Sequence, residues 1–282
     1  MLSYRHGFHA GNFADVLKHT VLVAVLDYLG RKPKPLVYID THAGAGSYDL
    51  GSDFPQKKRE YLSGIGRLWD LGVGDAPAAV SRYVDLVRTA NAAGVIEHYP
   101  GSPAIARSLL TAADRLILFE RHGNEAEALR RWAVGDRRLT VREEDGLAGC
   151  IGLLPPPSKR ALLLIDPAYE IKSDYEQVVK TLAAAHRRFA TGVYMLWYPV
   201  VERARVARMV EAIKATGIRR IARFELGIAP DSDGFGMTAS GVVIINPPFV
   251  LGGQMDEALP WLADRLSESG EGWFRSETLV GE

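Results

Sequence analysis

Short apolar segments alternate with helical patterns along most of the chain, and this alternation constrains the fold more than any other feature. The turn-rich link at 230–234 is too short for a crossover helix, so the seventh strand is expected to run antiparallel to the sixth. Strands that alternate with helices form a largely parallel sheet with helices on both faces, which predicts an α/β fold. The apolar segments that we interpret as strands cover residues 36–40, 116–120, 139–142, 161–166, 192–197, 218–226 and 241–245.

Three segments between these strands have the apolar spacing of amphipathic helices, namely residues 13–29, 174–189 and 202–215. In the last of them Val206, Met209, Val210 and Ile213 should face inward. The chain from Leu251 onward carries seven acidic residues against two Arg, a net charge of −5. We expect this end to form a solvated helix and a frayed tail.

Residues 47–113 are far too numerous for a simple connection between strands, and they contain helical patterns of their own at 60–71, 77–93 and 102–112. We therefore predict two units. A core domain would comprise residues 1–46 and 114–282, and residues 47–113 would form an inserted helical subdomain.

The charge balance limits the kinds of partner. Lys and Arg together number 34, as do Asp and Glu, so any nucleic-acid surface must be a local patch. A single cysteine, Cys150, excludes an internal disulfide and a zinc site built from cysteines. No apolar signal core begins the chain, and no apolar run approaches the roughly 18 residues of a membrane span. We expect a cytoplasmic protein that is a monomer and has no membrane partner.

The first strand ends in Asp40-Thr41-His42-Ala43-Gly44-Ala45-Gly46. Glycines at this place let the backbone approach a nucleotide-like cofactor at the sheet edge where parallel strands end. A dinucleotide fingerprint would need a third glycine, but that position is Asp49. The acid followed by Gly44 and Gly46 resembles instead motif I of S-adenosylmethionine-dependent methyltransferases. A tight glycine turn without a ligand is the alternative.

Two further acids follow the next two strands. Glu120 ends the second strand, where a carboxylate can accept both ribose hydroxyls of an adenosine. Asp145 and Gly146 follow the third strand and can contact the adenine amine. Either acid alone is common on a protein surface. Together with Asp40 they place acids at three successive strand ends, as a nucleoside site requires.

The fourth strand ends in Asp166-Pro167-Ala168-Tyr169, which resembles the Asp-Pro-Pro-Tyr motif of amino-group methyltransferases. The lone pair of an adenine amine is delocalised into the ring. The Asp166 carboxylate and the Pro167 carbonyl can accept its two N–H groups, and Tyr169 can stack on the base, so that positioning provides most of the rate. The alternative is a strand ended by proline. Ala168 replaces the second proline of the motif.

A second segment, Asn246-Pro247-Pro248-Phe249, fits the same motif better letter for letter. It follows the antiparallel seventh strand, so it should lie away from the cofactor edge. We therefore assign catalysis to Asp166 and interpret Asn246 as a structural turn.

The N-terminal segment is rich in aromatic, imidazole and cationic groups, including Tyr4, His6, His9, Lys18 and His19. We expect Tyr4 and His6 to fold over the pocket and meet an unstacked RNA base, and Lys18 and His19 to support the cofactor. A tail packed on the fold is the alternative. The pair His6 and His9 lacks further ligands nearby, so we expect no metal. A second basic region for RNA is residues 202–225, with a net charge of +4.

Several longer blocks resemble the ribosomal large-subunit methyltransferase J family over nearly the whole chain, from Met1 to about Leu262. They include Leu2-Ser3-Tyr4-Arg5-His6, Asp15-Val16-Leu17-Lys18-His19-Thr20, Tyr99-Pro100-Gly101-Ser102-Pro103, Trp197-Tyr198-Pro199-Val200-Val201 and Gly236-Met237-Thr238-Ala239-Ser240-Gly241. The resemblance implies a Rossmann-like class I methyltransferase fold with an inserted helical subdomain. It also implies methylation of N6 of one adenine in 23S ribosomal RNA, with S-adenosylmethionine and without a metal.

Matched motif by motif, the resemblance assigns Asp166 to catalysis and brings Tyr4 to the substrate base. It surrounds the cofactor with His19, His42, Ser102, Glu120, Asp145, Gly146 and Asp166. Two other readings stay open. One is a DNA adenine or protein glutamine methyltransferase with the same kind of pocket. The other is a catalytically silent RNA-binding factor of ribosome assembly.

Overall fold

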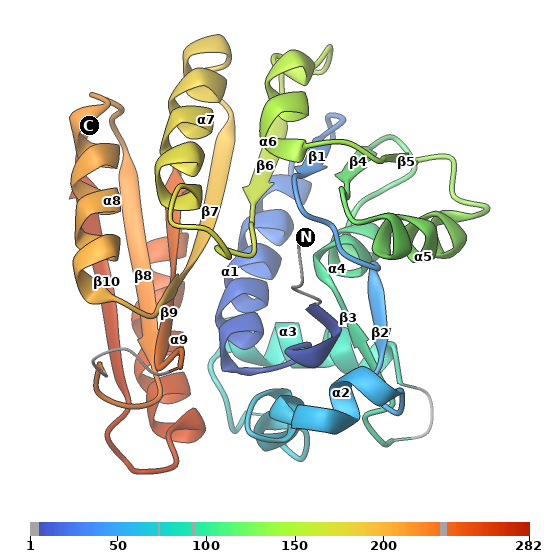
Figure 1. Ribbon diagram of the computed structural model, residues 1–282, viewed down its shortest axis with the longest axis vertical. Coiled ribbons are helices and arrows are strands. Elements are labelled where there is room, and N and C mark those ends of the chain that lie inside the picture. The colour runs from blue at the N-terminus through green and yellow to red at the C-terminus, as the bar shows by residue number, and fades with distance from the viewer. Residues whose placement is uncertain (1–5, 73, 92–93, 232–235) are drawn as a thin grey trace.

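A computed structural model describes residues 6–72, 74–91, 94–231 and 236–282 of the chain. In this part of the chain an eight-stranded sheet has the order β10-β8-β9-β7-β6-β1-β4-β5 (Figure 1). All seven predicted strands are present in it, and the α/β prediction is confirmed. Their bounds are β1 Val37–Asp40, β4 Arg115–Phe119, β5 Leu139–Arg142, β6 Ala161–Ile165, β7 Val193–Val200, β8 Ile221–Gly227 and β9 Ala239–Ile245.

The central strands pair in parallel, with β1 between β4 and β6, and with β5 and β7 outside them. Strand β9 runs antiparallel to both β7 and β8, as the short link before it predicts. We call the side where β1, β4, β5, β6 and β7 end the carboxyl edge, and the opposite side the amino edge. Because β9 is antiparallel, Asn246 and the residues after it lie at the amino edge.

The prediction of a solvated helix and a frayed tail after Leu251 is wrong. Helix α9 (Leu251–Leu266) buries Leu251, Met255, Leu259 and Leu262 against the core. The chain then forms β10 (Trp273–Val280), an edge strand antiparallel to β8. The acidic residues of this end occupy only the outer positions. The prediction relied on the net charge and overlooked the apolar residues, which lie on one face of the helix.

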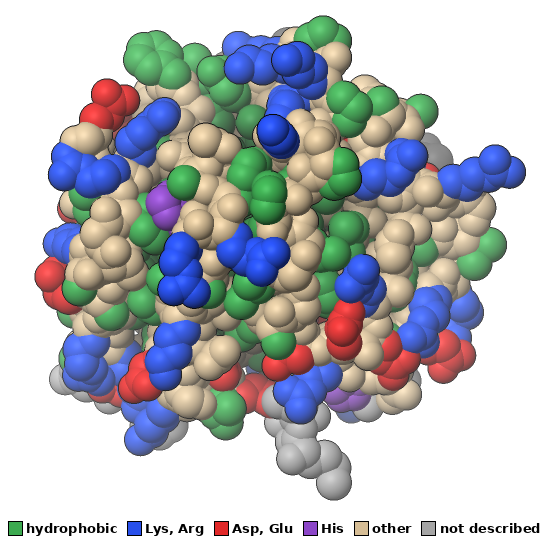
Figure 2. Space-filling model, turned by 90° about the horizontal axis from the view of Figure 1, so that it is seen from above, with side chains coloured by type: hydrophobic (Ala, Val, Ile, Leu, Met, Phe, Trp, Pro, Cys, Tyr) green, Lys and Arg blue, Asp and Glu red, His purple; other side chains and the backbone are tan. Residues whose placement is uncertain are grey.

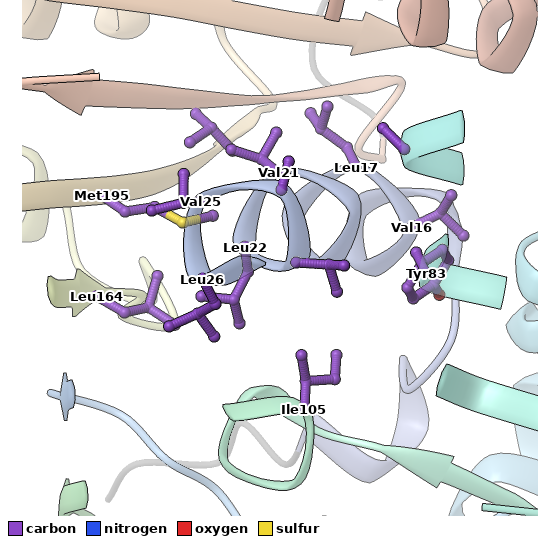
Figure 3. Packing of buried hydrophobic residues seen from close by; sticks show 14 of the residues in the cluster. Val16, Leu17, Val21, Leu22, Val25, Leu26, Tyr83, Ile105, Leu164 and Met195 are labelled. Carbon is purple, nitrogen blue, oxygen red and sulfur yellow. The ribbon is translucent and has the colours of Figure 1, made fainter. Parts of the chain in front are cut away.

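Helix α1 (Phe13–Gly30) is not amphipathic in the predicted sense, because every residue from Phe13 to Leu26 is buried. It contacts α3, α4, α9 and β9, so it lies between the sheet and the 47–113 segment. Figure 3 shows its apolar side chains pointing to several sides, with Leu164 and Met195 of the sheet, Tyr83 of α3 and Ile105 of α4 around them. The polar residues near its beginning face a pocket rather than solvent.

The other face of the sheet is covered by α7 (Asp174–Arg188) and α8 (Arg203–Ala215), with the short α6 (Gly146–Gly149) nearby. The four residues of α8 that we predicted to face inward are all buried. They belong to a second apolar cluster that also contains Ile165, Leu196 and Val178. Helix α5 (Gly123–Ala133) follows β4 and packs against β5.

Within residues 47–113 the described elements are β2 (Ser47–Asp49), α2 (Asp53–Lys58), α3 (Ala78–Thr89), β3 (His98–Pro100) and α4 (Ser102–Leu109). Strands β2 and β3 pair antiparallel in a small separate sheet, which the sequence reading missed. The predicted helix at 60–71 is wrong, since two short 3-10 helices, Glu60–Leu62 and Ile65–Leu68, occupy it. A Cβ on Gly64 would lie 2.1 Å from the Gly11 carbonyl oxygen, so this turn packs tightly on the start of α1. The division into two domains stays a prediction.

Candidate active site

A cavity of about 1160 Å³ opens at the carboxyl edge of the sheet. The loops after β1, β4, β5, β6 and β7 and the start of α1 contribute to its wall. Every described residue that we predicted for the site lines this cavity, namely His6, Lys18, His19, His42, Gly44, Ser102, Glu120, Asp145, Gly146, Asp166, Pro167 and Tyr169. Tyr4 lies outside the described residues. The topology therefore brings together side chains from both ends of a 160-residue stretch of sequence.

The loop after β1 forms one end of the cavity, and glycine is required in it. Gly44 has a φ of +58°, and a Cβ there would lie 2.1 Å from the Tyr48 hydroxyl oxygen. The Gly44 N–H donates to Glu120 Oε2 at 2.9 Å, and the His122 N–H donates to Glu120 Oε1 at 2.7 Å. Burial raises the pKa of Glu120, and the two N–H groups oppose this effect. Each carboxylate oxygen keeps a free lone pair for a ligand hydroxyl.

Below this loop, Asp40 is fully buried and does not line the cavity. Its Oδ2 atom accepts hydrogen bonds from the Tyr38 and Ser102 hydroxyls, both at 2.7 Å. Burial raises the pKa of Asp40, while Ser102 and Tyr38 lower it. Asp40 thus holds α4 in place through Ser102, which itself lines the cavity.

The loop after β5 is also held by an acidic side chain and by close packing at a glycine. Asp145 Oδ1 caps α6 by accepting the Leu147 and Ala148 N–H groups. A Cβ on Gly146 would lie 2.1 Å from the Thr41 carbonyl oxygen, so this loop packs directly on the loop after β1. His42 lies beside them, with Nδ1 2.8 Å from the Thr41 hydroxyl. Burial lowers the pKa of His42 to about 4, so its ring is neutral near pH 7.

At the other end of the cavity, Asp166 follows β6, and its Oδ2 atom lies 2.7 Å from Lys18 Nζ. Lys18 Nζ also lies 2.8 Å from Asp15 Oδ1, and His6 Nε2 lies 2.9 Å from Asp15 Oδ2. Burial raises the pKa of Asp166 to about 6, although the Lys18 ammonium lowers it. The carboxylate pair raises the pKa of Lys18 against the effect of burial, so Lys18 is a cation.

We predicted Lys18 as a cofactor residue, but the structure places its ammonium group against the Asp166 carboxylate. Asp15, which joins Lys18 to His6, was missed as a site residue. Its signal was present, because Asp15 and Lys18 are three residues apart on one helix and therefore share a face. His9 does not join His6 in a metal site. It lies 2.8 Å from Glu60, and no group of three or more described His, Cys, Asp or Glu residues could hold a metal ion.

Aromatic rings line the same cavity as Asp166. Tyr169 has a φ of +53°, and its hydroxyl donates to the Trp197 carbonyl at 2.8 Å. Its ring contacts Tyr175, with ring centroids 4.6 Å apart. Lys18 Nζ lies 5.8 Å from the centroid of the Trp197 ring. We did not predict Trp197 as a site residue. No periodicity in the sequence indicates that β7 brings its ring to this cavity.

His19 lies on the cavity wall, and a chain of buried hydrogen bonds fixes its tautomer. Tyr83 and Tyr99 hydroxyls lie 2.9 Å apart, and the Tyr99 hydroxyl lies 2.7 Å from His19 Nδ1. Tyr83 has no other hydrogen-bond partner among the described residues, so the arrangement in which Tyr83 donates to Tyr99 and Tyr99 donates to Nδ1 gives both hydroxyl protons an acceptor. Burial lowers the pKa of His19 to about 3. The neutral ring therefore carries its hydrogen on Nε2, a buried atom without a partner in the described chain.

The strand order, with antiparallel β9 beside β7 and a cavity lined by strand-terminal acids at the carboxyl edge, defines a Rossmann-like methyltransferase fold. Comparison with known proteins then gives the family. A family model described as "Ribosomal RNA large subunit methyltransferase D, RlmJ" matches residues 33–280. The chain belongs to this methyltransferase family.

Individual relatives agree with this assignment over their full length. The chain is 50% identical over 282 residues to Ribosomal RNA large subunit methyltransferase J of Escherichia coli (strain K12), with all of both chains covered. It is 47% identical over 283 residues to the protein of the same name from Haemophilus influenzae, again with both covered completely. The crystal structure of a Legionella pneumophila protein superposes with a TM-score of 0.88 at 36% identity, covering 96% of this chain and 98% of that one.

Proposed function

We propose that this chain methylates N6 of an adenine in 23S ribosomal RNA, with S-adenosylmethionine as the methyl donor. The observation that carries the proposal is one continuous cavity with Glu120 and the glycine loop at one end and Asp166 at the other. One end suits a nucleoside, and the other suits an amine that must be held by acceptors. The family and its relatives support ribosomal RNA as the substrate class. We place the reaction in the cytoplasm.

The described residues fit the cofactor. Gly44 has no Cβ, which leaves room beside Tyr48, and Glu120 has lone pairs for ribose hydroxyls. The Nε2 atom of His19 is a buried hydrogen-bond donor without a partner in the described chain, which suits a ligand carboxylate. The cavity is also larger than the ~300–1,000 Å³ typical of one small ligand, which leaves space for an extruded base. The cofactor would supply an electrophilic methyl group between these two ends.

In the proposed mechanism Asp166 orients and activates the amine. The ionised carboxylate accepts one N–H of the adenine amine, and the Pro167 carbonyl, to which no described group donates, accepts the other. This turns the nitrogen lone pair out of conjugation and toward the methyl group. Lys18 keeps Asp166 ionised, and Asp15 and His6 hold Lys18 in place. Tyr169 and Trp197 form an aromatic wall against which the base stacks.

The experiment that tests this function is mapping of N6-methyladenine across 23S ribosomal RNA in cells with and without the gene. One adenine should lose its methyl group in the deletion strain and regain it when the wild-type gene is returned. A complete 23S methylation pattern in the deletion strain, with loss of a mark on DNA or protein instead, would contradict the proposal. A chain that binds ribosomal RNA but restores no mark would indicate the silent assembly factor.

The activity should depend on pH through Asp166. Its pKa of about 6 predicts that the single-turnover methylation rate falls as the pH drops through about 6, because the protonated acid is a weaker acceptor than the carboxylate for the N–H of the amine. Lys18→Met removes the cation that stabilises the ionised form, so the half-point should move to higher pH, by about 1 unit or more. Lys180→Met, an exposed lysine of α7, serves as the control and should leave the profile unchanged. If an active Lys18→Met enzyme showed the same pH profile as the wild type, the fall in rate at low pH would belong to another group.

A further inference from the structure

The amino edge of the sheet, opposite the cavity, carries a face rich in cations. Figure 2 looks onto this face, and Lys and Arg side chains are spread across it while Asp and Glu lie at its margins. The cations come from the loops that precede the strands and from the last turn of α7. The exposed or partly exposed examples used below are Lys32 and Lys34 before β1, Lys159 before β6, Arg187 and Arg188 before β7, and Arg219 before β8.

These six cations are not neutralised within the described chain, since none forms an ion pair with a described carboxylate. Two described acids near this edge already have a cationic partner. Asp136 pairs with Arg138 at 2.7 Å, and Glu282 lies 3.8 Å from Arg220. The region 202–225 that we predicted as one basic surface is divided by the fold. Arg203 pairs with Glu225 and Asp231 near the cavity, whereas Arg219 belongs to the amino-edge face.

The same face contains Phe249, whose side chain is 93% exposed. It belongs to the Asn246-Pro247-Pro248-Phe249 segment, which resembles an amino-methyltransferase motif but lies at the edge away from the cavity. The Asn246 amide donates to the Ala190 and Gly192 carbonyls at 2.8 and 2.7 Å. These bonds hold the side chain of Asn246 at the amino edge, and Asn246 does not line the cavity. The same bonds fix the segment beside the turn that carries Arg187 and Arg188.

We propose that the amino-edge face, defined by Phe249 and these six cations, is a second contact surface for single-stranded RNA. Phe249 stacks on an unpaired base, and the surrounding Lys and Arg contact phosphates. An exposed aromatic ring held rigidly among unpaired cations matches the two requirements of single-strand binding, a stacking platform and a positive track. The proposal rests on the proposed function, because it assumes that the substrate is a long RNA. It adds that the RNA is held at both edges of the sheet.

The first test compares Phe249→Ala with Phe274→Ala. Phe274 is 45% exposed and lies near the start of β10, at the other end of the sheet, so it is a matched aromatic control. Affinity for a long ribosomal RNA fragment should fall about tenfold in Phe249→Ala, within the range for loss of a stacked aromatic, and stay unchanged in Phe274→Ala. A minimal hairpin that fills only the cavity should be methylated at the wild-type rate by both. Equal affinities of the two variants for the long fragment would overturn the role of Phe249.

The second test measures the salt dependence of binding. Each phosphate contact of single-stranded RNA contributes about −0.7 to the slope of log affinity against log salt, so Lys32→Ala/Lys34→Ala/Arg187→Ala should flatten the slope by about 2. The control is Arg82→Ala/Lys180→Ala/Arg265→Ala, which removes one cation each from α3, α7 and α9, none of them among the six of the amino-edge face. Equal slopes in the two triple variants would contradict RNA binding at the amino-edge face. They would favour another partner, such as an acidic protein. If the wild type methylates no RNA at all, the proposed function fails instead.

Discussion

Replacing Asp166 with alanine is expected to lower the rate of methyl transfer about 100- to 1,000-fold, which is the usual cost of removing one preorganised transition-state contact. The carboxylate lies at the end of β6, where Lys18 holds it at 2.7 Å, so its loss removes an acceptor without disturbing the core. Binding of S-adenosylhomocysteine and the melting temperature should change little. Transfer of labelled methyl groups to transcribed ribosomal RNA measures the rate.

Asn246→Ala is the matched comparison, because Asn246 occupies the same place in the second motif. Its amide holds two carbonyl oxygens at the amino edge, and its φ is +55°. This variant should lose stability and keep its rate per folded molecule. An inactive Asn246→Ala enzyme beside an active Asp166→Ala enzyme would show that catalysis belongs to the other motif.

Replacing Glu120 with alanine is expected to raise the dissociation constant of S-adenosylhomocysteine by roughly 10- to 100-fold for each ribose hydroxyl bond that is lost. A hydrogen bond to a charged group contributes about 1.5–3 kcal/mol, and about 1.4 kcal/mol corresponds to a factor of ten. Calorimetric titration gives the constant directly. The effect should also include some loosening of the loop, because Glu120 accepts the Gly44 N–H.

Two further variants separate these contributions. Glu120→Gln keeps the shape and an acceptor for one N–H, so it should lose less affinity than the alanine variant. Glu127→Ala removes an exposed carboxylate on α5 whose one ion pair among the described residues is with Arg131 on the same helix, and should bind as the wild type does. An unchanged constant in Glu120→Ala would place Glu120 outside the cofactor site.

Much of the site was predictable because parallel strands concentrate their ends at one edge. Glu120, Asp145 and Asp166 each follow an apolar run, and a single topological rule brings them to one cavity. The preference for Asp166 over Asn246 needed only the direction of the seventh strand. Motif letters alone would have favoured Asn246, which lies at the amino edge and does not line the cavity.

The contacts made by α1 were not predictable in this way. Its apolar positions indicate a helix, but the burial of Asp15, Lys18 and His19 depends on what surrounds that helix. Lys18 and Asp166 are 148 positions apart, and their pairing arises only when α1 crosses the carboxyl edge between the sheet and α3. The Tyr83, Tyr99 and His19 chain is similar, since its three members come from three separate elements.

The sequence by itself determined the seven central strands, the order of the motifs along them and the chemistry of the groups at their ends. Local patterns encode these properties because apolar periodicity and strand-terminal acids act over a few residues. Only the tertiary structure decided that the acidic end of the chain adds α9 and β10 to the core, and that Lys18 faces Asp166. It also decided that Phe249 lies among cations at the amino edge. These outcomes depend on which segments pack against one another in the folded protein. The net charge or periodicity of one segment does not indicate which other segment it will contact.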